Sequence, residues 1–237
     1  MAEWLDEIEN AALRMQLVLD ICRVLKSNAC QRIDFHYMSI HVNGAGFAAV
    51  AGALMDNAQG KKGVAAAFGD LPTQAAASYV SGTNTLTVPP GFRIKSVLDK
   101  HMVVHECVHA MQDILEGSRP MRMVVAPRTT LRVDNEGAAW VAAALYLLYE
   151  SGMPDPSSKA PFVAAQEIAM RIKDWPGVGV AARDVARMRA TLRAIPAYRH
   201  LRGRARTIAD VISPVPRNPT RAIRRPPRQR HRPDRPR

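Results

Sequence analysis

The chain has 237 residues but few cysteines, and their arrangement does not suggest a structural role. The three are Cys22, Cys30 and Cys107, an odd number with no Cys-x-x-Cys pair. A disulfide framework and a cysteine zinc knuckle both need paired cysteines, so neither is expected. A reducing compartment is indicated.

The sequence also lacks the apolar segments of exported and membrane proteins. Residues 1–9 are acidic and amphipathic, without the basic start and apolar stretch of a secretory signal. The apolar stretch Ala138–Leu148 is shorter than the roughly 18 residues that a membrane span requires. We therefore predict a cytoplasmic protein with no transmembrane segment, although export by a route that needs no signal peptide stays open.

Positive charge is concentrated at one end of the sequence. Residues 202–237 hold twelve Arg, no Lys and two acids, which accounts for +10 of the total +12 and leaves +2 for residues 1–201. Pro and Arg dominate this segment, so we predict a disordered basic tail over 202–237 and one folded domain over 1–201. Clustered Arg could bind nucleic acid or an acidic surface, although the tail has no interleaved aromatic residues.

Hydrophobic residues make up 47% of the chain, enough to bury a core. Their spacing predicts an α+β fold that is mainly α-helical. Helices are expected over 3–28, about 94–115, 131–150, 161–174 and 178–195, a strand over 33–42, and two short β segments over 78–88 around a Ser-Gly-Thr-Asn turn. Residues 47–77, rich in Ala but interrupted by Gly and Pro, are ambiguous. The apolar stripe of the first helix, expected to face the core, is Leu5, Ile8, Ala12, Met15, Leu19 and Cys22.

The helix over 94–115 contains the motif His105-Glu106-Cys107-Val108-His109. Histidines four residues apart lie on one helix face, so both rings can bind one ion. Zinc binds imidazole nitrogen, and a catalytic zinc keeps one position for water. Glu106 is the natural general base for that metal-activated water. By residue frequencies the motif is expected about 0.01 times by chance in such a chain.

The third metal ligand must come from farther along the chain. A metzincin-type extension is excluded, because Gln112 and Leu115 stand where that class has Gly and His. Downstream carboxylates include Glu116, Glu136, Glu150 and Glu167. Glu136 is favoured, since it starts the next helix and an antiparallel return would bring it beside the two histidines.

The other polar residues near the motif are expected to lie away from the ion. Glu116 is about 10 Å along the axis from His109, and Glu150 is about 21 Å beyond Glu136. His101 is one turn too far to join a tetrahedral site, so a surface or supporting role is expected. Cys107 points away from the histidines and is expected in the core.

The two segments His105–His109 and Asn135-Glu136-Gly-Ala-Ala resemble the gluzincins, zinc peptidases of which thermolysin is the familiar member. The resemblance covers about residues 78–150. It implies a minimal zincin-like core, with a small β-sheet before the motif helix and an antiparallel helix that carries the third ligand. It further implies zinc binding by His105, His109 and Glu136, catalysis by Glu106, a supporting role for Asn135, and a substrate-binding β edge at Thr83–Val88.

The chain departs from that family at one position. Where gluzincins often have an Asp that orients a zinc histidine, this chain has Trp140, so the support differs or comes from Asp113 or Asp134. Candidates for stabilising the transition state are Tyr146, Tyr149, Tyr198 and His200. The sequence thus predicts a zinc metallopeptidase acting on a peptide or protein substrate. The alternative is a protein that binds nucleic acid or an acidic surface and has a degenerate or structural metallopeptidase-like core.

Overall fold

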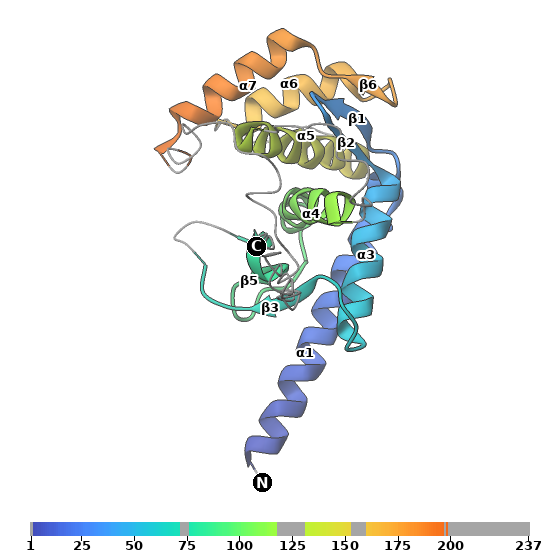
Figure 1. Ribbon diagram of the computed structural model, residues 1–237, viewed down its shortest axis with the longest axis vertical. Helices are drawn as coiled ribbons and strands as arrows, with labels where there is room; N and C mark the ends of the chain where they lie inside the picture. The colour runs from blue at the N-terminus through green and yellow to red at the C-terminus, as the bar shows by residue number, and fades with distance from the viewer. Residues whose placement is uncertain (1, 72–75, 118–130, 153–159, 197, 199–237) are drawn as a thin grey trace, which may run out of the picture.

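The computed structural model describes residues 2–71, 76–117, 131–152, 160–196 and 198, which form a mixed α+β structure dominated by helices (Figure 1). The α+β, mainly helical class predicted from the sequence is confirmed. In chain order the elements are α1 (Ala2–Leu25), α2 (Asn28–Gln31), β1 (Asp34–Tyr37), β2 (Ile40–Asn43), α3 (Gly44–Ala58), β3 (Ala65–Phe68), β4 (Ser78–Val80), the 3₁₀ helix η1 (Ser81–Thr83), β5 (Thr85–Val88), α4 (Val97–Gly117), α5 (Arg132–Ser151), α6 (Phe162–Ile172), β6 (Val178–Gly179) and α7 (Ala182–Ala194). None of the helices described is both long and apolar enough to cross a membrane. The predicted basic tail lies outside the described residues.

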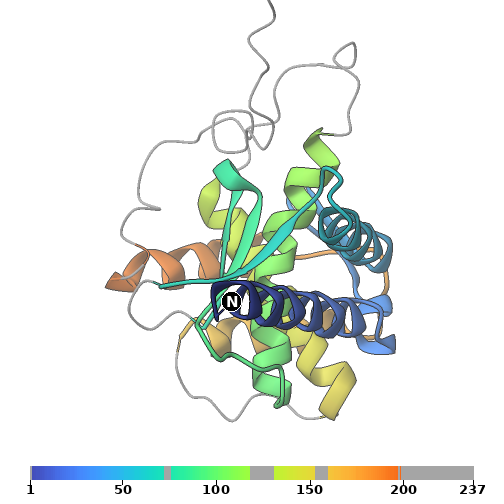
Figure 2. The same cartoon turned by 90° about the horizontal axis from the view of Figure 1, so that it is seen from below.

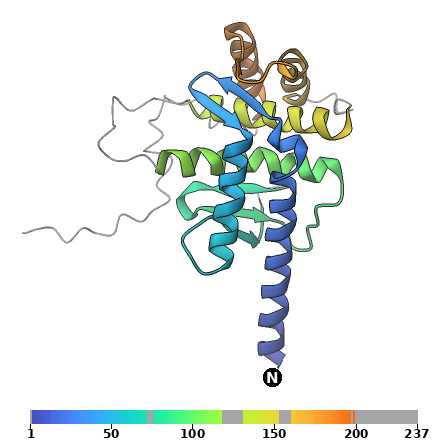
Figure 3. The same ribbon diagram turned by 90° about the vertical axis from the view of Figure 1, so that its right-hand side faces the viewer.

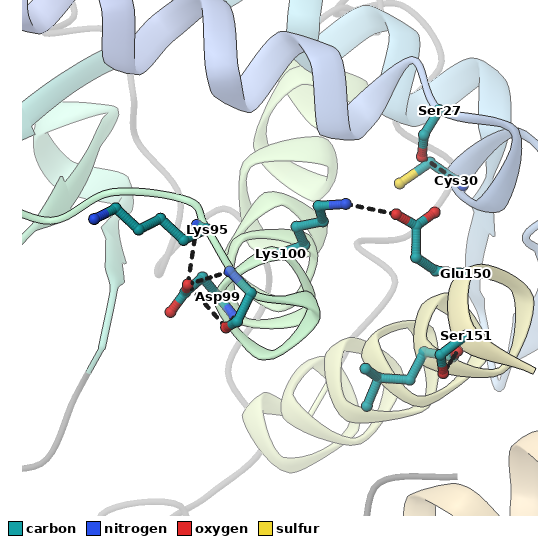
Figure 4. Close-up of polar contacts among 9 residues, drawn as sticks. Ser27, Cys30, Lys95, Asp99, Lys100, Glu150 and Ser151 are labelled. Carbon is teal, nitrogen blue, oxygen red and sulfur yellow. Dashed lines mark hydrogen bonds and ion pairs between the residues drawn. The ribbon is translucent and has the colours of Figure 1, made fainter. Parts of the chain in front are cut away.

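The helix α5 lies at the centre of the structure, between α4 on one side and α6 and α7 on the other (Figure 1). Of its 20 residues, 14 are buried, which explains why its sequence is apolar on nearly every face. It runs antiparallel to α4. Near the start of α4, Lys100 forms an ion pair of 2.6 Å with Glu150 near the end of α5 (Figure 4).

The first turn of α4 is fixed by side-chain caps. Ser96 Oγ accepts a hydrogen bond from the Asp99 backbone N–H, at 3.1 Å, and Asp99 Oδ2 accepts one from the Ser96 N–H, at 2.8 Å. Figure 4 shows Asp99 also accepting from the backbone of Lys95. This reciprocal capping box sets the helix start at Val97, three residues later than predicted.

At the start of α5, the capping residue is Leu131, which makes no side-chain cap bond. Asp134, in the first turn, does not cap the helix. The Asp134 carboxylate instead accepts two hydrogen bonds, of 2.6 and 2.7 Å, from the Arg189 guanidinium of α7. This bidentate pair fixes α7 against the turn of α5 that carries Glu136.

Two small three-stranded sheets complete the fold, with strand orders β2-β1-β6 and β3-β5-β4. The single strand predicted over 33–42 is a hairpin, which turns at Met38 with a left-handed φ of 55°. The ambiguous segment divides into α3 and β3, and residues 178–179 form β6 instead of helix. Both β segments predicted over 78–88 are confirmed as β4 and β5. Figures 1 and 2 show the β3-β5-β4 sheet lying against α4.

Gly137 allows α5 to pack closely against the β1–β2 hairpin. A Cβ atom at this position would lie 2.5 Å from the Tyr37 hydroxyl oxygen, so any side chain would collide with the buried tyrosine. Because Gly137 follows Glu136 directly, this close contact also determines how far the Glu136 turn lies from the hairpin.

The prediction that the apolar stripe of α1 faces the core is wrong for most of its length. Ile8, Met15 and Leu19 are exposed, whereas Cys22 is buried. The body packs against a different face of α1, through Leu17, Val18, Ile21, Val24 and Leu25. The first half of α1 projects away from the rest of the structure (Figures 1 and 3).

Candidate metal centre

The two motif histidines lie one turn apart on α4 and face the same neighbour, α5. Their ring centroids are 5.2 Å apart, with the rings nearly perpendicular. The side chain of His105 is 4% exposed and that of His109 is 15% exposed. Two imidazoles are thus held at the boundary between the core and the surface, where an ion could reach both.

Glu136 lies opposite this pair, as predicted from its position at the start of α5. Its Oε2 is 3.5 Å from Nε2 of His105, and its Oε1 is 3.6 Å from Nε2 of His109. One ligand atom from each of the three residues lies within 4.8 Å of the other two. Among the described residues, no other group of His, Cys, Asp and Glu has this geometry.

Glu106 borders the three-residue group without belonging to it. Its Oε1 is 3.9 Å from Nε2 of His105, and its Oε2 accepts a 2.8 Å hydrogen bond from the backbone N–H of Tyr79 in β4. Burial raises the pKa of Glu106, although the charges of the two histidines act to lower it. Burial lowers the pKa of His105, but contact with Glu136 and the charge of Glu106 outweigh it, so the pKa is raised. Two carboxylates around two imidazoles create a local potential that favours a cation.

Tyr79 is anchored at its other end to the motif helix. Its hydroxyl lies 2.5 Å from Asp113 Oδ2 on α4 and 2.5 Å from Asn84 Oδ1 in the turn before β5. Burial raises the pKa of Asp113 to about 6, although the hydrogen bond with Tyr79 lowers it. This network keeps β4 against α4 and thereby keeps the Tyr79 N–H directed at Glu106.

The predicted β edge at Thr83–Val88 is wrong. Its strand, β5, is the central strand of its sheet, paired with β3 on one side and β4 on the other. Within the described part of the chain, β4 pairs only with β5 and forms the edge next to Glu106. The strand order, which sets the edge, depends on β3, and the sequence left β3 unassigned.

Trp140 occupies the position where an orienting Asp was considered. Its ring centroid is 4.3 Å from that of His105, and its Nε1 donates a 3.1 Å hydrogen bond to the hydroxyl of Tyr198. Neither proposed carboxylate contacts a histidine of the site, because Asp113 bonds to Tyr79 and Asp134 to Arg189. His105 is therefore held by ring packing. Within the described residues, its Nδ1 has no hydrogen-bond partner.

The four candidates for transition-state stabilisation have different locations. The Tyr149 hydroxyl donates to the Lys173 carbonyl, at 2.6 Å, and Tyr146 is fully buried, with its hydroxyl near Glu150. His200 lies outside the described residues. Tyr198 is near the site: burial and the charges of Glu136 and Glu106 raise its pKa. Its phenol therefore keeps its proton at neutral pH.

The remaining residues considered in the sequence are Cys107, His101, Glu150, Glu116 and Asn135. Cys107 is buried, as predicted, and burial raises its pKa well above the usual thiol range. His101 is also buried and packs edge-on against Phe162, so of the two roles predicted for it the surface role is wrong and the supporting role stays a prediction. Glu150 is paired with Lys100 at the far end of α5. The side chain of Glu116 lies outside the described part of the chain. Asn135 Oδ1 is buried without a hydrogen-bond partner among the described residues, and the supporting role of Asn135 stays a prediction.

Two features that shape the site were not predicted from the sequence. One is the backbone N–H of Tyr79, whose only sequence signal is a β segment directly before the motif helix. The other is the packing of Trp140 on His105. The sequence placed Trp140 on the correct helix, but nothing in it indicated this contact. Comparisons with protein-family models, with curated proteins and with solved structures find no match to this chain. The geometry of the site therefore carries the functional conclusion.

Proposed function

We propose that the protein is a zinc-dependent metallopeptidase with a small zincin-like core. His105, His109 and Glu136 bind the metal, and Glu106 is the general base. The observation that carries this proposal is the convergence of one carboxylate and two imidazoles from antiparallel helices, with a second, separately held carboxylate beside them.

The donor set fits zinc. Two imidazoles and one carboxylate are a common protein ligand set for catalytic zinc, which leaves one position for water or substrate. Ligand atoms about 2.0–2.1 Å from one tetrahedral ion are about 3.3 Å apart. The 3.5 and 3.6 Å contacts join different Glu136 oxygens to the two histidines, and one ligand atom from each residue lies within 4.8 Å of the others, so the three side chains would move somewhat closer together to bind one ion.

Glu106 is arranged to move a proton. When bound, zinc supplies a Lewis acid that polarises a carbonyl and lowers the pKa of water to about 7. Tyr79 holds one oxygen of Glu106, and the other oxygen faces His105. The second oxygen can accept a proton from the attacking water and then donate it to the leaving amine.

A peptide is the substrate class that the surroundings favour. The edge strand β4 directs its Tyr79 N–H at Glu106, so the unpaired side of β4 borders the site. An extended polypeptide that adds to such an edge passes beside the general base. In this proposal β4, and not the predicted Thr83–Val88 segment, is the substrate-binding edge.

Tyr198 is the residue best placed to stabilise the transition state. Peptide hydrolysis places negative charge on the carbonyl oxygen, and a donor directed at that oxygen lowers the barrier. The phenol of Tyr198 is protonated, is close enough to Glu136 and Glu106 for their charges to raise its pKa, and receives the Trp140 N–H on its oxygen. In the proposed mechanism its hydroxyl donates its hydrogen to that carbonyl oxygen.

Replacing Tyr198 by Phe is expected to lower kcat about 10²–10³-fold while KM and zinc content stay close to wild type. Steady-state cleavage of a fluorogenic peptide measures the split between kcat and KM. Tyr149→Phe is the matched control, because it removes a hydroxyl that bonds only to the Lys173 carbonyl in the described structure. A kcat equal to wild type in Tyr198→Phe would remove this residue from the mechanism.

The proposal is tested on the full chain by metal analysis and cleavage of an unfolded protein. We expect one zinc per chain by mass spectrometry of metals, and cleavage of β-casein that stops after treatment with 1,10-phenanthroline and returns with added Zn²⁺. A protein that binds no zinc, or one that cleaves equally well without metal, contradicts the proposal. Zinc binding without any cleavage would favour a structural metal site instead.

A further inference from the structure

One face of α1 presents an apolar surface that nothing in the described structure covers. Trp4 is 62% exposed, Ile8 48%, Met15 38% and Leu19 42%. Ala11 and Ala12, between them, are exposed as well. The first half of α1 projects away from the body, as Figures 1 and 3 show.

These residues form one continuous stripe. At 100° per residue, the four large side chains fall within about 60° of the helix circumference, with Ala11 and Ala12 on either side. The face that packs on the body, around Ile21, is centred more than 100° away. The stripe is therefore separate from the core contact and resembles the seam of a helix that pairs with another helix.

We propose that this surface binds α1 of a second copy of the chain, antiparallel, about a two-fold axis between Ala11 and Ala12. The proposal does not depend on the peptidase activity. A two-fold interface requires one patch to complement itself. With this axis, residues whose numbers add to 23 face each other. Trp4 then faces Leu19 of the second copy and Ile8 faces its Met15, while the two alanines let the helices approach at the centre.

The charges on α1 select the antiparallel direction. Its first third carries four acids and no base: Glu3, Asp6, Glu7 and Glu9. Glu7 and Glu9 lie about 90° and 110° from the centre of the stripe, on opposite sides, so parallel pairing would bring Glu7 of each copy near Glu9 of the other, which is destabilising. Antiparallel pairing instead brings Glu7 within about two residues, or 3 Å along the axis, of Arg14 in the second copy. Both residues are exposed and lie on the same side of the stripe.

The oligomeric state of the full chain tests the surface. A two-helix contact is at the small end of specific interfaces, so sedimentation is measured up to about 100 μM. We expect a species of twice the 26.1 kDa chain mass. The double variant Ile8→Glu and Met15→Glu is expected to be monomeric with an unchanged circular dichroism spectrum, since both side chains are exposed. Met170→Glu, at an exposed methionine on α6, should remain dimeric. A monomeric wild type, or a dimer that survives the double variant, overturns the proposal.

Disulfide cross-linking tests the direction and the axis. The native cysteines are buried and should not interfere. In Ala12→Cys, the two copies are expected to cross-link to each other through position 12 under mild oxidation. Trp4→Cys and Leu19→Cys should cross-link only when mixed, because each lies fifteen residues, or about 22 Å, from its own symmetry mate. Self-cross-linking of Trp4→Cys would indicate parallel helices and overturn the antiparallel arrangement.

Discussion

Replacing Glu106 by Gln is expected to abolish most cleavage without releasing the metal. The amide keeps an oxygen that can accept the Tyr79 N–H, so the local packing is retained. It cannot take a proton from water, and loss of a positioned general base lowers kcat by about 10²–10⁴-fold. Metal analysis and a β-casein assay on the same preparation measure the two effects together.

The matched control for this variant is Glu167→Gln. Glu167 lies on α6, where its carboxylate pairs with Arg187 at the surface. This variant should cleave at the wild-type rate. Wild-type cleavage by Glu106→Gln itself would show that another residue is the base, and it would contradict the proposed mechanism even if zinc were bound.

Replacing Glu136 by Ala is expected to weaken zinc binding about 100-fold or more. Residues that only support metal ligands already contribute about 10–100-fold to affinity, and a direct ligand should contribute at least as much. A 100-fold change corresponds to about 2.7 kcal/mol. Zinc should therefore raise the melting temperature of the wild type but have little effect on this variant.

Glu150→Ala provides the comparison on the same helix. Glu150 pairs with Lys100, at the opposite end of the α4–α5 contact from the candidate site. Its removal should lower stability slightly and leave the zinc-dependent rise in melting temperature intact. If Glu136→Ala binds zinc as tightly as wild type, Glu136 is not a ligand and the third ligand lies elsewhere.

Local sequence patterns predicted the elements around the site well. The two histidines and Glu136 were placed together from helix periodicity and from the length of the connection between helices. Both are short-range properties, because residues four apart on a helix share a face whatever the rest of the chain does. The capping box at Ser96 and Asp99 was also present in the sequence, but apolar periodicity alone extended the helix back to Ile94.

The predictions that were wrong concern features that depend on tertiary structure. The spacing of Ile8, Met15 and Leu19 correctly indicates a helix with an apolar face, but spacing cannot tell whether that face meets the body or another chain. Likewise, β5 had the composition of a strand, but its central place follows from the pairing of the Ala-rich β3 beside it. The backbone N–H of Tyr79 has no side-chain signature at all.

The contact between Trp140 and His105 makes the intrinsic fluorescence of Trp140 a probe of the candidate site. The chain has three tryptophans, and the other two, Trp4 and Trp175, are 62% and 68% exposed, whereas Trp140 is 7% exposed. A buried indole emits at shorter wavelength than solvated ones, and its ring lies 4.3 Å from an imidazole proposed to bind the ion. The intensity and colour of this emission thus respond to events at the proposed ligands. Metal titrations can therefore be followed without a label at the short-wavelength side of the emission, where the exposed Trp4 and Trp175 contribute least.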